Sequence, residues 1–146
     1  MDAGHTEIEL TMRMFTETAT TQVGGRLRYT DAEPYAVTLV FRGDGLAGSP
    51  IEWIFARDLL ATGVLAASGD GDVRVWPADT TSLIFFELRS PSGQAVFAAD
   101  KRQVERFLAE TERIVPTGAE PAAIEMDHHL ATLLGGEPGL APPELR

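Results

Sequence analysis

The chain has 146 residues, enough for one domain with its own hydrophobic core, and it contains no cysteine, which excludes disulfides and thiolate chemistry. Its 22 acidic residues outweigh 12 basic ones, and the net charge of −10 disfavours partners whose binding depends on lysine and arginine, namely nucleic acids and anionic lipids. No apolar run approaches the roughly 20 residues that cross a bilayer, and the acidic N-terminus lacks the plan of a signal peptide, so we expect a cytoplasmic protein without membrane insertion.

The first third of the chain predicts three antiparallel strands. Residues Thr6 to Phe15 alternate, and their apolar face is formed by Ile8, Leu10, Met12 and Met14. After a threonine-rich connection and Gly24-Gly25, a second, short strand is expected over Arg26 to Thr30. The turn signal Asp31-Ala32-Glu33-Pro34 leads into a third strand, Tyr35 to Arg42, with Tyr35, Val37, Leu39 and Phe41 on one face.

The stretch from Ile51 to Pro77 contains both tryptophans and predicts a strand, a short helix, a turn and a second strand. Its opening alternation places Ile51, Trp53 and Phe55 on the core face. Helical spacing follows from Arg57 and closes at Gly63, a residue that commonly ends helices. A turn at Gly69-Asp70-Gly71 then leads into the alternating segment Asp72 to Trp76, which Pro77 stops.

The last third predicts a hairpin followed by helices. Residues Ser82 to Arg89 are apolar on both faces, which indicates a strand covered on both sides, by a helix or by a second subunit. A turn at Ser90 to Gly93 and a returning strand follow. Asp100 and Gln103 form a capping-box-like start for a helix over residues 101–114. A last amphipathic helix is expected over Ile124 to Leu134.

These elements predict an α+β fold of curved, mainly antiparallel sheet, with seven or eight strands and packed helices. We expect one domain over residues 1–134. The proline- and glycine-rich end, residues 135–146, is expected to be a disordered tail.

No catalytic or cofactor motif stands out, so we expect neither an enzyme nor a cofactor. Glu125 and His128 have the E-x-x-H spacing of carboxylate-bridged metal sites, but such sites need several ligand-bearing helices. The segment Asp70-Gly71-Asp72 resembles part of a calcium loop but lacks the remaining ligands, and a plain turn explains it. Nucleophile elbows, phosphate loops and dinucleotide fingerprints are absent from the sequence.

One segment is a candidate partner surface, formed by Asp70, Asp72, Arg74 and Trp76. It combines a turn, two acids, an arginine and a large aromatic ring that could be exposed at a sheet edge. The competing interpretation places Trp76, like Trp53, in the core and gives the acids only a role in the turn. Five arginines alternate with apolar neighbours and are therefore expected on the solvent-facing side of their strands, where they form either a binding face or an ordinary charged sheet surface. They are Arg26, Arg28, Arg42, Arg74 and Arg89.

The chain resembles the SsgA-like proteins, regulators of sporulation-specific cell division in filamentous actinomycetes. Two motifs are specific: WIFARDLL from Trp53, followed by GDGDVRVWP from Gly69. Three further segments match in order and spacing: DAEPYAVTLVFR, LRSPSGQAVFAA and VERFLAETERIVPTGAE. The resemblance covers about residues 5–134, whereas Gly43 to Pro50 and the end after Gly135 depart from it.

This resemblance implies a non-enzymatic adaptor of sporulation septation, recruited from the cytoplasm to the division septum. Its implied partners are the tubulin-like GTPase of the Z-ring, reached directly or through other SsgA-like or membrane-associated proteins. It also implies a fold similar to the Whirly single-stranded nucleic-acid-binding proteins and a homo-oligomer, with a trimer favoured. The alternative function is single-stranded nucleic-acid binding by the sheet, which the charge of −10 and the single lysine, Lys101, disfavour.

Overall fold

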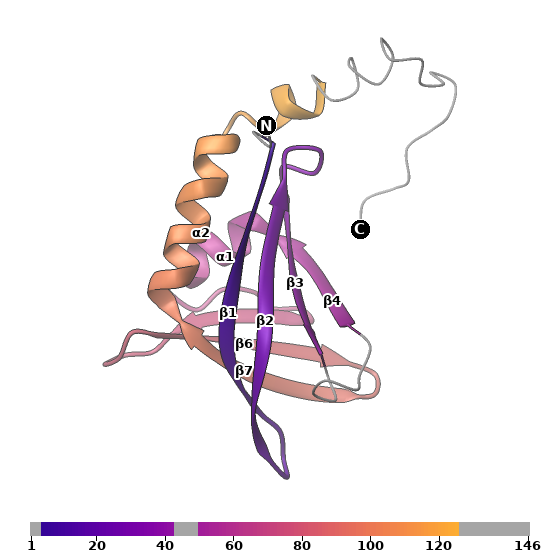
Figure 1. The fold of residues 1–146 in the computed structure, drawn as a ribbon, viewed down its shortest axis with the longest axis vertical. Coiled ribbons are helices and arrows are strands. Elements are labelled where there is room, and N and C mark those ends of the chain that lie inside the picture. Colours follow the sequence, from indigo (N-terminus) through magenta and orange to yellow (C-terminus); the bar gives the residue numbers. More distant parts are fainter. Residues whose placement is uncertain (1–3, 43–49, 126–146) are drawn as a thin grey trace.

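The computed structural model describes residues 4–42 and 50–125 and contains one seven-stranded antiparallel sheet, the helices α1 and α2, and a further helical stretch over residues 120–125 (Figure 1). The first four strands precede helix α1 (Arg57–Gly63), and the next three precede helix α2 (Lys101–Ile114). The strands are β1 (His5–Phe15), β2 (Thr20–Thr30), β3 (Ala36–Arg42), β4 (Pro50–Ala56), β5 (Val73–Pro77), β6 (Leu83–Ser90) and β7 (Gly93–Asp100). The predicted antiparallel α+β class is confirmed, whereas the likeness to Whirly proteins stays a prediction.

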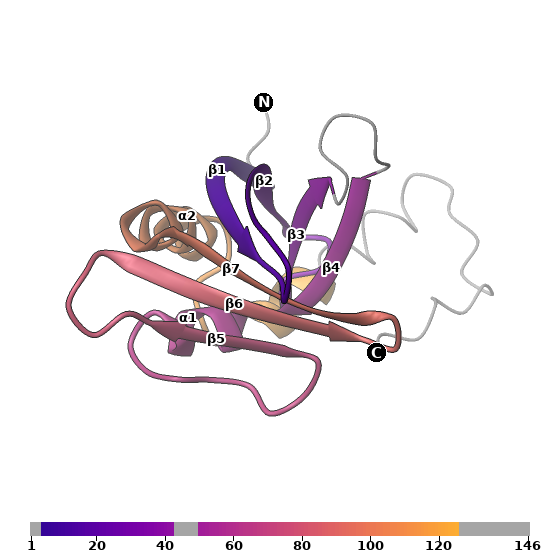
Figure 2. The ribbon, with the colours of Figure 1, turned by 90° about the horizontal axis from the view of Figure 1, so that it is seen from below.

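The sheet curls so that its two halves run across one another (Figures 1 and 2). The strand order is β4-β3-β2-β1-β7-β6-β5, so the halves join where β1 pairs with β7 over only three residue pairs, from Arg13↔Ala98 to Phe15↔Val96. Strands β4 and β5 are therefore the two edges. Both helices pack against the inner side of the curl, and this leaves the outer side of the sheet open to solvent.

Alternation along the strands builds the core between the two halves. On β1, the predicted apolar face contributes Leu10 and Met12, which are fully buried, and Ile8 and Met14, which are half-buried. The same period holds on β3 and β6, where every second residue faces inward. The largest fully buried side chains include Phe86, Phe97, Phe107, Leu27, Leu39, Leu60 and Ile84. Removing this apolar surface from water is the main force that closes the sheet.

Two strand predictions were wrong in their extent. Strand β2 begins at Thr20 rather than Arg26, because it pairs with β1 along its whole length, from Phe15↔Thr20 to His5↔Thr30. This continuous pairing overrides the low strand propensity of Gly24 and Gly25. At the start of β3, Tyr35 belongs to the turn and is 49% exposed, so it does not share the core face.

Gly63, the last residue of the short helix α1, is a glycine for a reason that the sequence pattern did not indicate. The helix closes on Val64 in right-handed helical conformation, so Gly63 is not needed for a left-handed turn. Instead, a Cβ atom at Gly63 would collide with the side chain of Val75 on β5. The glycine therefore allows α1 to approach the sheet closely. A positive φ of 96° does occur at Gly69, in the predicted turn that follows.

We expect Gly63→Ala to lower the free energy of unfolding by about 1–3 kcal/mol, since overpacking against Val75 outweighs the gain in helix propensity. Gly71→Ala is the matched control, because nothing lies within 4 Å of a Cβ atom at Gly71. Urea denaturation of both variants measures the difference. A Gly63→Ala protein as stable as the control would show that the helix can shift away without loss.

Helix α2 follows its prediction closely. The carboxylate of Asp100 accepts a hydrogen bond from the backbone N–H of Arg102 at 2.9 Å and caps the helix. Val104, Phe107 and Thr111 form the buried stripe, and the helix ends before Pro116. Helical backbone resumes at residue 120 and continues to residue 125. Residues 43–49 and 126–146 lie outside the described residues. Most of the predicted last helix, His128 and the predicted tail fall within the second of these ranges.

Candidate protein-interaction surface

The outer side of β5 and β6 carries aromatic and charged side chains that lie opposite the core. Arg74 and Trp76 alternate with the buried Val73 and Val75, so they point away from the core. The strand register then places Trp76 beside Phe85 and Arg74 beside Glu87. We call this outer patch the Trp76 surface; it consists of Arg74, Trp76, Phe85, Glu87 and Arg89.

The aromatic rings of the Trp76 surface are stacked and only partly covered. Trp76 and Phe85 lie with ring centroids 5.6 Å apart and an interplanar angle of 23°. The guanidinium of Arg74 lies 5.8 Å from the centroid of the Trp76 ring, in cation–π range. Both rings are half-buried in the isolated chain. The arrangement therefore presents an aromatic platform of two stacked rings with an arginine beside it.

Glu87 is an unusual component of this surface, because its carboxylate is nearly buried on an otherwise exposed sheet face. The residue is 8% exposed. One of its oxygens lies 3.5 Å from a terminal nitrogen of Arg74 and 3.8 Å from the Nε of Arg89. Both arginine side chains are about half exposed, at 45% and 53%. A guanidinium has five N–H donors, so each arginine keeps donors for a partner.

A hollow borders the Trp76 surface at the outer edge of β5. It has a volume of about 420 Å³ and is lined by Leu65, Ala66, Ala67, Arg74, Trp76, Pro77 and Asp79. Leu65 is 80% exposed, the highest value among the large exposed apolar residues of the described chain. The hollow thus offers apolar walls, one cation (Arg74) and one anion (Asp79) to a side chain of a partner.

The structure brings together only part of the sequence-predicted surface. Arg74 and Trp76 lie on one face, and the expectation that Trp76 belongs to the core was wrong, because that ring points away from it. Asp72 is exposed just before β5, where its backbone C=O accepts a hydrogen bond from the N–H of Arg89 at 2.9 Å. Asp70 is exposed in the turn. Sequence reasoning did not include Phe85 and Glu87 in this surface; the two-sided apolar pattern of β6 pointed to Phe85, whereas nothing in the sequence pointed to Glu87.

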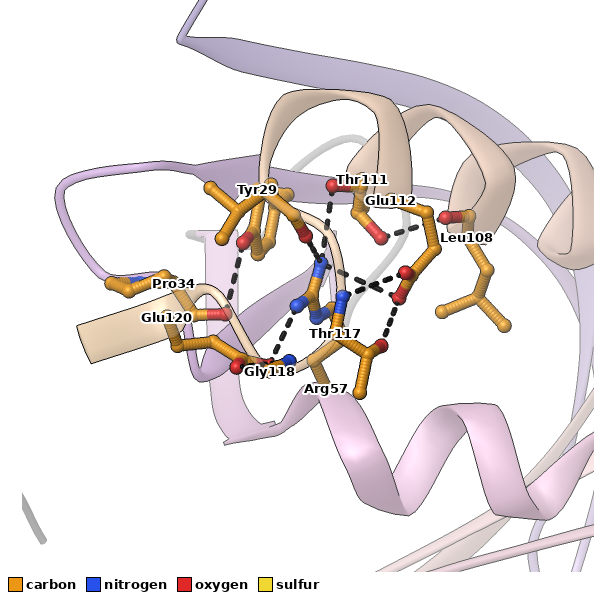
Figure 3. Close-up of polar contacts among 10 residues, drawn as sticks. Tyr29, Pro34, Arg57, Leu108, Thr111, Glu112, Thr117, Gly118 and Glu120 are labelled. Carbon is orange, nitrogen blue, oxygen red and sulfur yellow. Dashed lines mark hydrogen bonds and ion pairs between the residues drawn. The ribbon is translucent and has the colours of Figure 1, made fainter. Parts of the chain in front are cut away.

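A second polar cluster is buried around Arg57, the first residue of α1 (Figure 3). Arg57 is 3% exposed. One terminal nitrogen donates to the backbone C=O groups of Thr111 and Val115 at 3.1 and 2.7 Å, where α2 ends. The other donates to the carboxylate of Glu120 at 2.8 Å. Its guanidinium also lies 5.0 Å from the centroid of the Tyr29 ring. We interpret this cluster as a structural clamp that joins α1, α2 and the following turn.

The turn after α2 is tied into the clamp by two glutamates. The carboxylate of Glu112 accepts hydrogen bonds from the backbone N–H and the hydroxyl of Thr117, at 2.9 and 2.5 Å. The carboxylate of Glu120 also accepts one from the N–H of Gly118 at 2.7 Å. Burial raises the pKa of Tyr29 to about 12, with an opposing effect from Arg57. The Tyr29 hydroxyl donates to the C=O of Pro34 at 2.9 Å.

The clamp predicts a loss of stability in acid. The hydrogen bond from Arg57 lowers the pKa of Glu120. Burial alone would raise the pKa of Glu112, but the hydrogen bonds from Thr117 outweigh it and lower that pKa too. Because both values lie below those of the unfolded chain, at about 4.3, the stabilisation is complete above that pH and falls as the pH drops through the folded values.

Urea denaturation between about pH 6 and pH 3, on both sides of the ordinary pKa of a glutamate, tests this expectation. The wild-type protein should lose stability more steeply on acidification than Glu120→Gln, which has no proton to take up at that position. Equal slopes for the two proteins would contradict a role of Glu120 in the acid response.

Within residues 4–42 and 50–125, no group of three or more histidine or carboxylate side chains is arranged to hold a metal ion. None of the helices in these ranges combines the length and the apolar character needed to cross a membrane.

Comparison with known proteins places the chain among sporulation proteins. Residues 23–120 match the family model described as "Streptomyces sporulation and cell division protein, SsgA". The chain is 42% identical over 118 residues to the sporulation-specific cell division protein SsgB of Frankia casuarinae, covering 80% of this chain and 81% of that protein. SsgB of Streptomyces coelicolor is 42% identical over 110 residues, covering 74% and 79%.

Two solved structures share the fold. The structure of an SsgA-like sporulation-specific cell division protein from Thermobifida fusca matches with a TM-score of 0.78 and 34% identity, covering 91% of this chain and 98% of that one. A structure from work on SsgB mutations that correlate to longitudinal cell division in Streptomyces coelicolor matches with a TM-score of 0.74 and 38% identity, covering 82% and 94%. Because a family model and relatives at about 40% identity agree along most of the chain, the protein belongs to the SsgA family.

Proposed function

We propose that this protein is a non-enzymatic regulator of sporulation-specific cell division, an adaptor that acts through the tubulin-like Z-ring machinery. The observation that carries the proposal is its similarity, over about four fifths of its length, to proteins named as sporulation-specific cell division proteins. In this role the protein is cytoplasmic and is recruited to the division septum. It contacts the tubulin-like GTPase directly or through other SsgA-like or membrane-associated proteins.

The Trp76 surface supports a protein-binding role. Tryptophan and arginine are enriched among the residues that contribute most to protein–protein affinity, and Trp76 and Arg74 stand next to one another on an open sheet face. Substitution of Asp72 and Arg74 by alanine tests this surface in cells. Loss of septal localisation by a folded double variant is expected, and unchanged localisation would remove the start of β5 from the interface.

A homo-oligomer is part of the same proposal, with three copies favoured by the family resemblance. The sequence argument for it was the two-sided apolar pattern of Ser82 to Arg89. The structure uses one side of this strand for the core and leaves Phe85 half-covered and Leu83 39% exposed on the surface. A second copy is therefore one candidate occupant of the Trp76 surface. Light scattering at micromolar concentration tests this point, and a monomer mass would contradict it.

Ion pairing across the outer side of β1 to β4 argues against the alternative, single-stranded nucleic-acid binding. Arg26 lies 3.8 Å from Glu7 and 3.7 Å from Glu9, measured between nitrogen and carboxylate oxygen. Arg28 lies 3.0 Å from Glu52. Phosphate binding needs several uncompensated cations along the strand path. We therefore expect no measurable affinity for oligothymidine, and salt-sensitive, submicromolar binding would overturn the adaptor proposal.

The deciding experiment places a fluorescent fusion of this protein in sporulating hyphae of Streptomyces coelicolor, beside a labelled tubulin-like division GTPase. The fusion is expected to overlap with the rings of the GTPase when sporulation septa form. A fusion that stays diffuse while the rings assemble normally would contradict recruitment to the septum.

A further inference from the structure

The two edges of the sheet differ in how they are protected. At the β5 edge, Ser68 pairs with Val75 in both directions, N–H to C=O at 2.8 and 2.9 Å. Gly69 lies so close that a Cβ atom there would collide with the C=O of Val73, and Pro77 has no N–H. These features close the β5 edge to another strand. Natural sheets commonly protect their edges in such ways, because an open edge is a template for pairing.

The β4 edge has no such protection within residues 4–42 and 50–125. The N–H of Arg57 donates to the C=O of Tyr35 at 2.7 Å, and this fixes which β4 residues bond to β3. In an antiparallel ladder every second residue bonds to the neighbouring strand, so the odd-numbered residues of β4 pair with β3. The N–H and C=O groups of Glu52 and Ile54, and the N–H of Ala56, point away from the sheet.

The side chains along this edge are apolar on both faces of the strand. Ile54 is 61% exposed on the outer side. On the inner side, Ile51 is 39% exposed and Trp53 is half-buried against the rim of the core. The edge is continuous over seven residues, and its only proline, Pro50, stands at the first position, where proline does not interrupt pairing. An incoming strand would thus gain main-chain hydrogen bonds and apolar contacts together.

Charge indicates what kind of strand fits. Glu52 lies on the edge with a side chain that is half exposed, and Asp58 is exposed two residues beyond Ala56. Arg28 pairs with Glu52 at 3.0 Å, but the whole protein has a charge of −10. A second copy would bring the same acids and the same net charge to the contact, whereas a basic strand would be attracted.

We propose that the β4 edge binds an extended segment of a partner protein, with alternating apolar and basic side chains, by adding it to the sheet as an eighth strand. The apolar residues of the segment pack on the inner side, against Ile51 and Trp53. Its basic residues lie on the outer side near Glu52, with their aliphatic stems on Ile54. This site lies at the opposite end of the strand order from the Trp76 surface. The two surfaces can therefore be tested separately.

The experiment measures fluorescence anisotropy of a labelled octapeptide that alternates valine and lysine, titrated with the full chain. The wild-type protein is expected to bind it at low salt. A valine–glutamate octapeptide should bind about tenfold more weakly or worse, because Glu52 and Asp58 repel it. A valine–lysine octapeptide with every backbone nitrogen methylated should not bind, because it has no N–H to donate to the edge.

Variants at Ile54 separate main-chain pairing from simple charge attraction. Ile54→Pro removes an N–H that bonds to no other strand, so the fold should persist while peptide affinity falls at least about tenfold. Ile54→Val, the matched control, should keep its affinity within about twofold. Circular dichroism and thermal unfolding confirm that each variant is folded.

Three results would overturn the proposal: no binding of the valine–lysine peptide to the wild-type protein, equal binding by Ile54→Pro, or equal binding of the methylated peptide. A fourth contradicting result would be that the wild-type protein forms an oligomer and that Ile54→Pro dissociates it. The β4 edge would then be occupied by a second copy of this chain rather than by a partner protein.

Discussion

Replacing Arg57 with methionine is expected to lower the free energy of unfolding by about 3–5 kcal/mol, the largest stability effect of any single charged residue described in this chain. Methionine keeps much of the apolar stem, so the change isolates the loss of the guanidinium. It leaves the Glu120 carboxylate, whose side chain is 12% exposed, without its cation. It also removes the Arg57 donor from the C=O of Val115 and one of the two donors from the C=O of Thr111, which still accepts from the N–H of Val115.

A double-mutant cycle shows how much of this loss comes from the ion pair. Glu120→Gln keeps an acceptor for Arg57 and removes the charge, so it should be milder than Arg57→Met. The two changes together should destabilise by less than the sum of the single changes, because the buried carboxylate is the main uncompensated group.

Urea denaturation, with the midpoint and the slope both fitted, measures these differences. The matched control is Arg26→Met, which breaks ion pairs between exposed side chains, with Arg26 48% exposed and Glu7 and Glu9 43% and 85% exposed, and should cost only about 0–1 kcal/mol. An Arg57→Met protein that loses no more than this control would show that Arg57 is not a clamp.

The core of this fold could be predicted from alternation because each strand has one covered face. Leu10 and Met12 on β1 and Val37 and Leu39 on β3 were assigned to the core from period two alone, and all four are nearly inaccessible to solvent. The stripe of α2 was predictable for the same reason at a period of 3.6. These assignments need only the local sequence pattern, because the face of a strand or helix that carries the apolar residues is the face that becomes buried.

The burial of Arg57 could not be predicted in the same way. A charged residue after a strand is assigned to solvent by default, and nothing near Arg57 in the sequence indicates a partner. Its acceptors are 54, 58 and 63 residues further along the chain. Only the closing of α1 onto the end of α2 brings them together, and local periodicity carries no information on that contact.

The position of Trp76 was ambiguous for a different reason. Alternation separates Val73 and Val75 from Arg74 and Trp76, but it does not say which face the helices cover. The sheet curls so that α1 and α2 lie on the valine side. Trp76 therefore lies on the outer side of the sheet. This agrees with the partner-surface interpretation, which the sequence alone favoured less than a place in the core.

The second large effect is expected at Trp76. If the Trp76 surface binds a division protein, Trp76→Ala should weaken that binding by about 2–4 kcal/mol, or roughly 30-fold to 1000-fold. The substitution removes the ring that stacks on Phe85 at 5.6 Å and that forms a wall of the hollow beside Leu65. It also removes the platform that holds Arg74.

Two control variants make this result specific. Trp76→Phe keeps an aromatic ring on Phe85 and should retain most of the affinity. Asp70→Ala changes an exposed turn residue outside the Trp76 surface and should have no effect. Binding is measured with the purified tubulin-like division GTPase and, in hyphae, as septal localisation of the fluorescent fusion. Since Trp76 points away from the core, the Trp76→Ala protein should remain folded, with a loss of only about 1 kcal/mol. A folded Trp76→Ala protein that still reaches the septum and binds within about twofold of wild type would place the interface elsewhere.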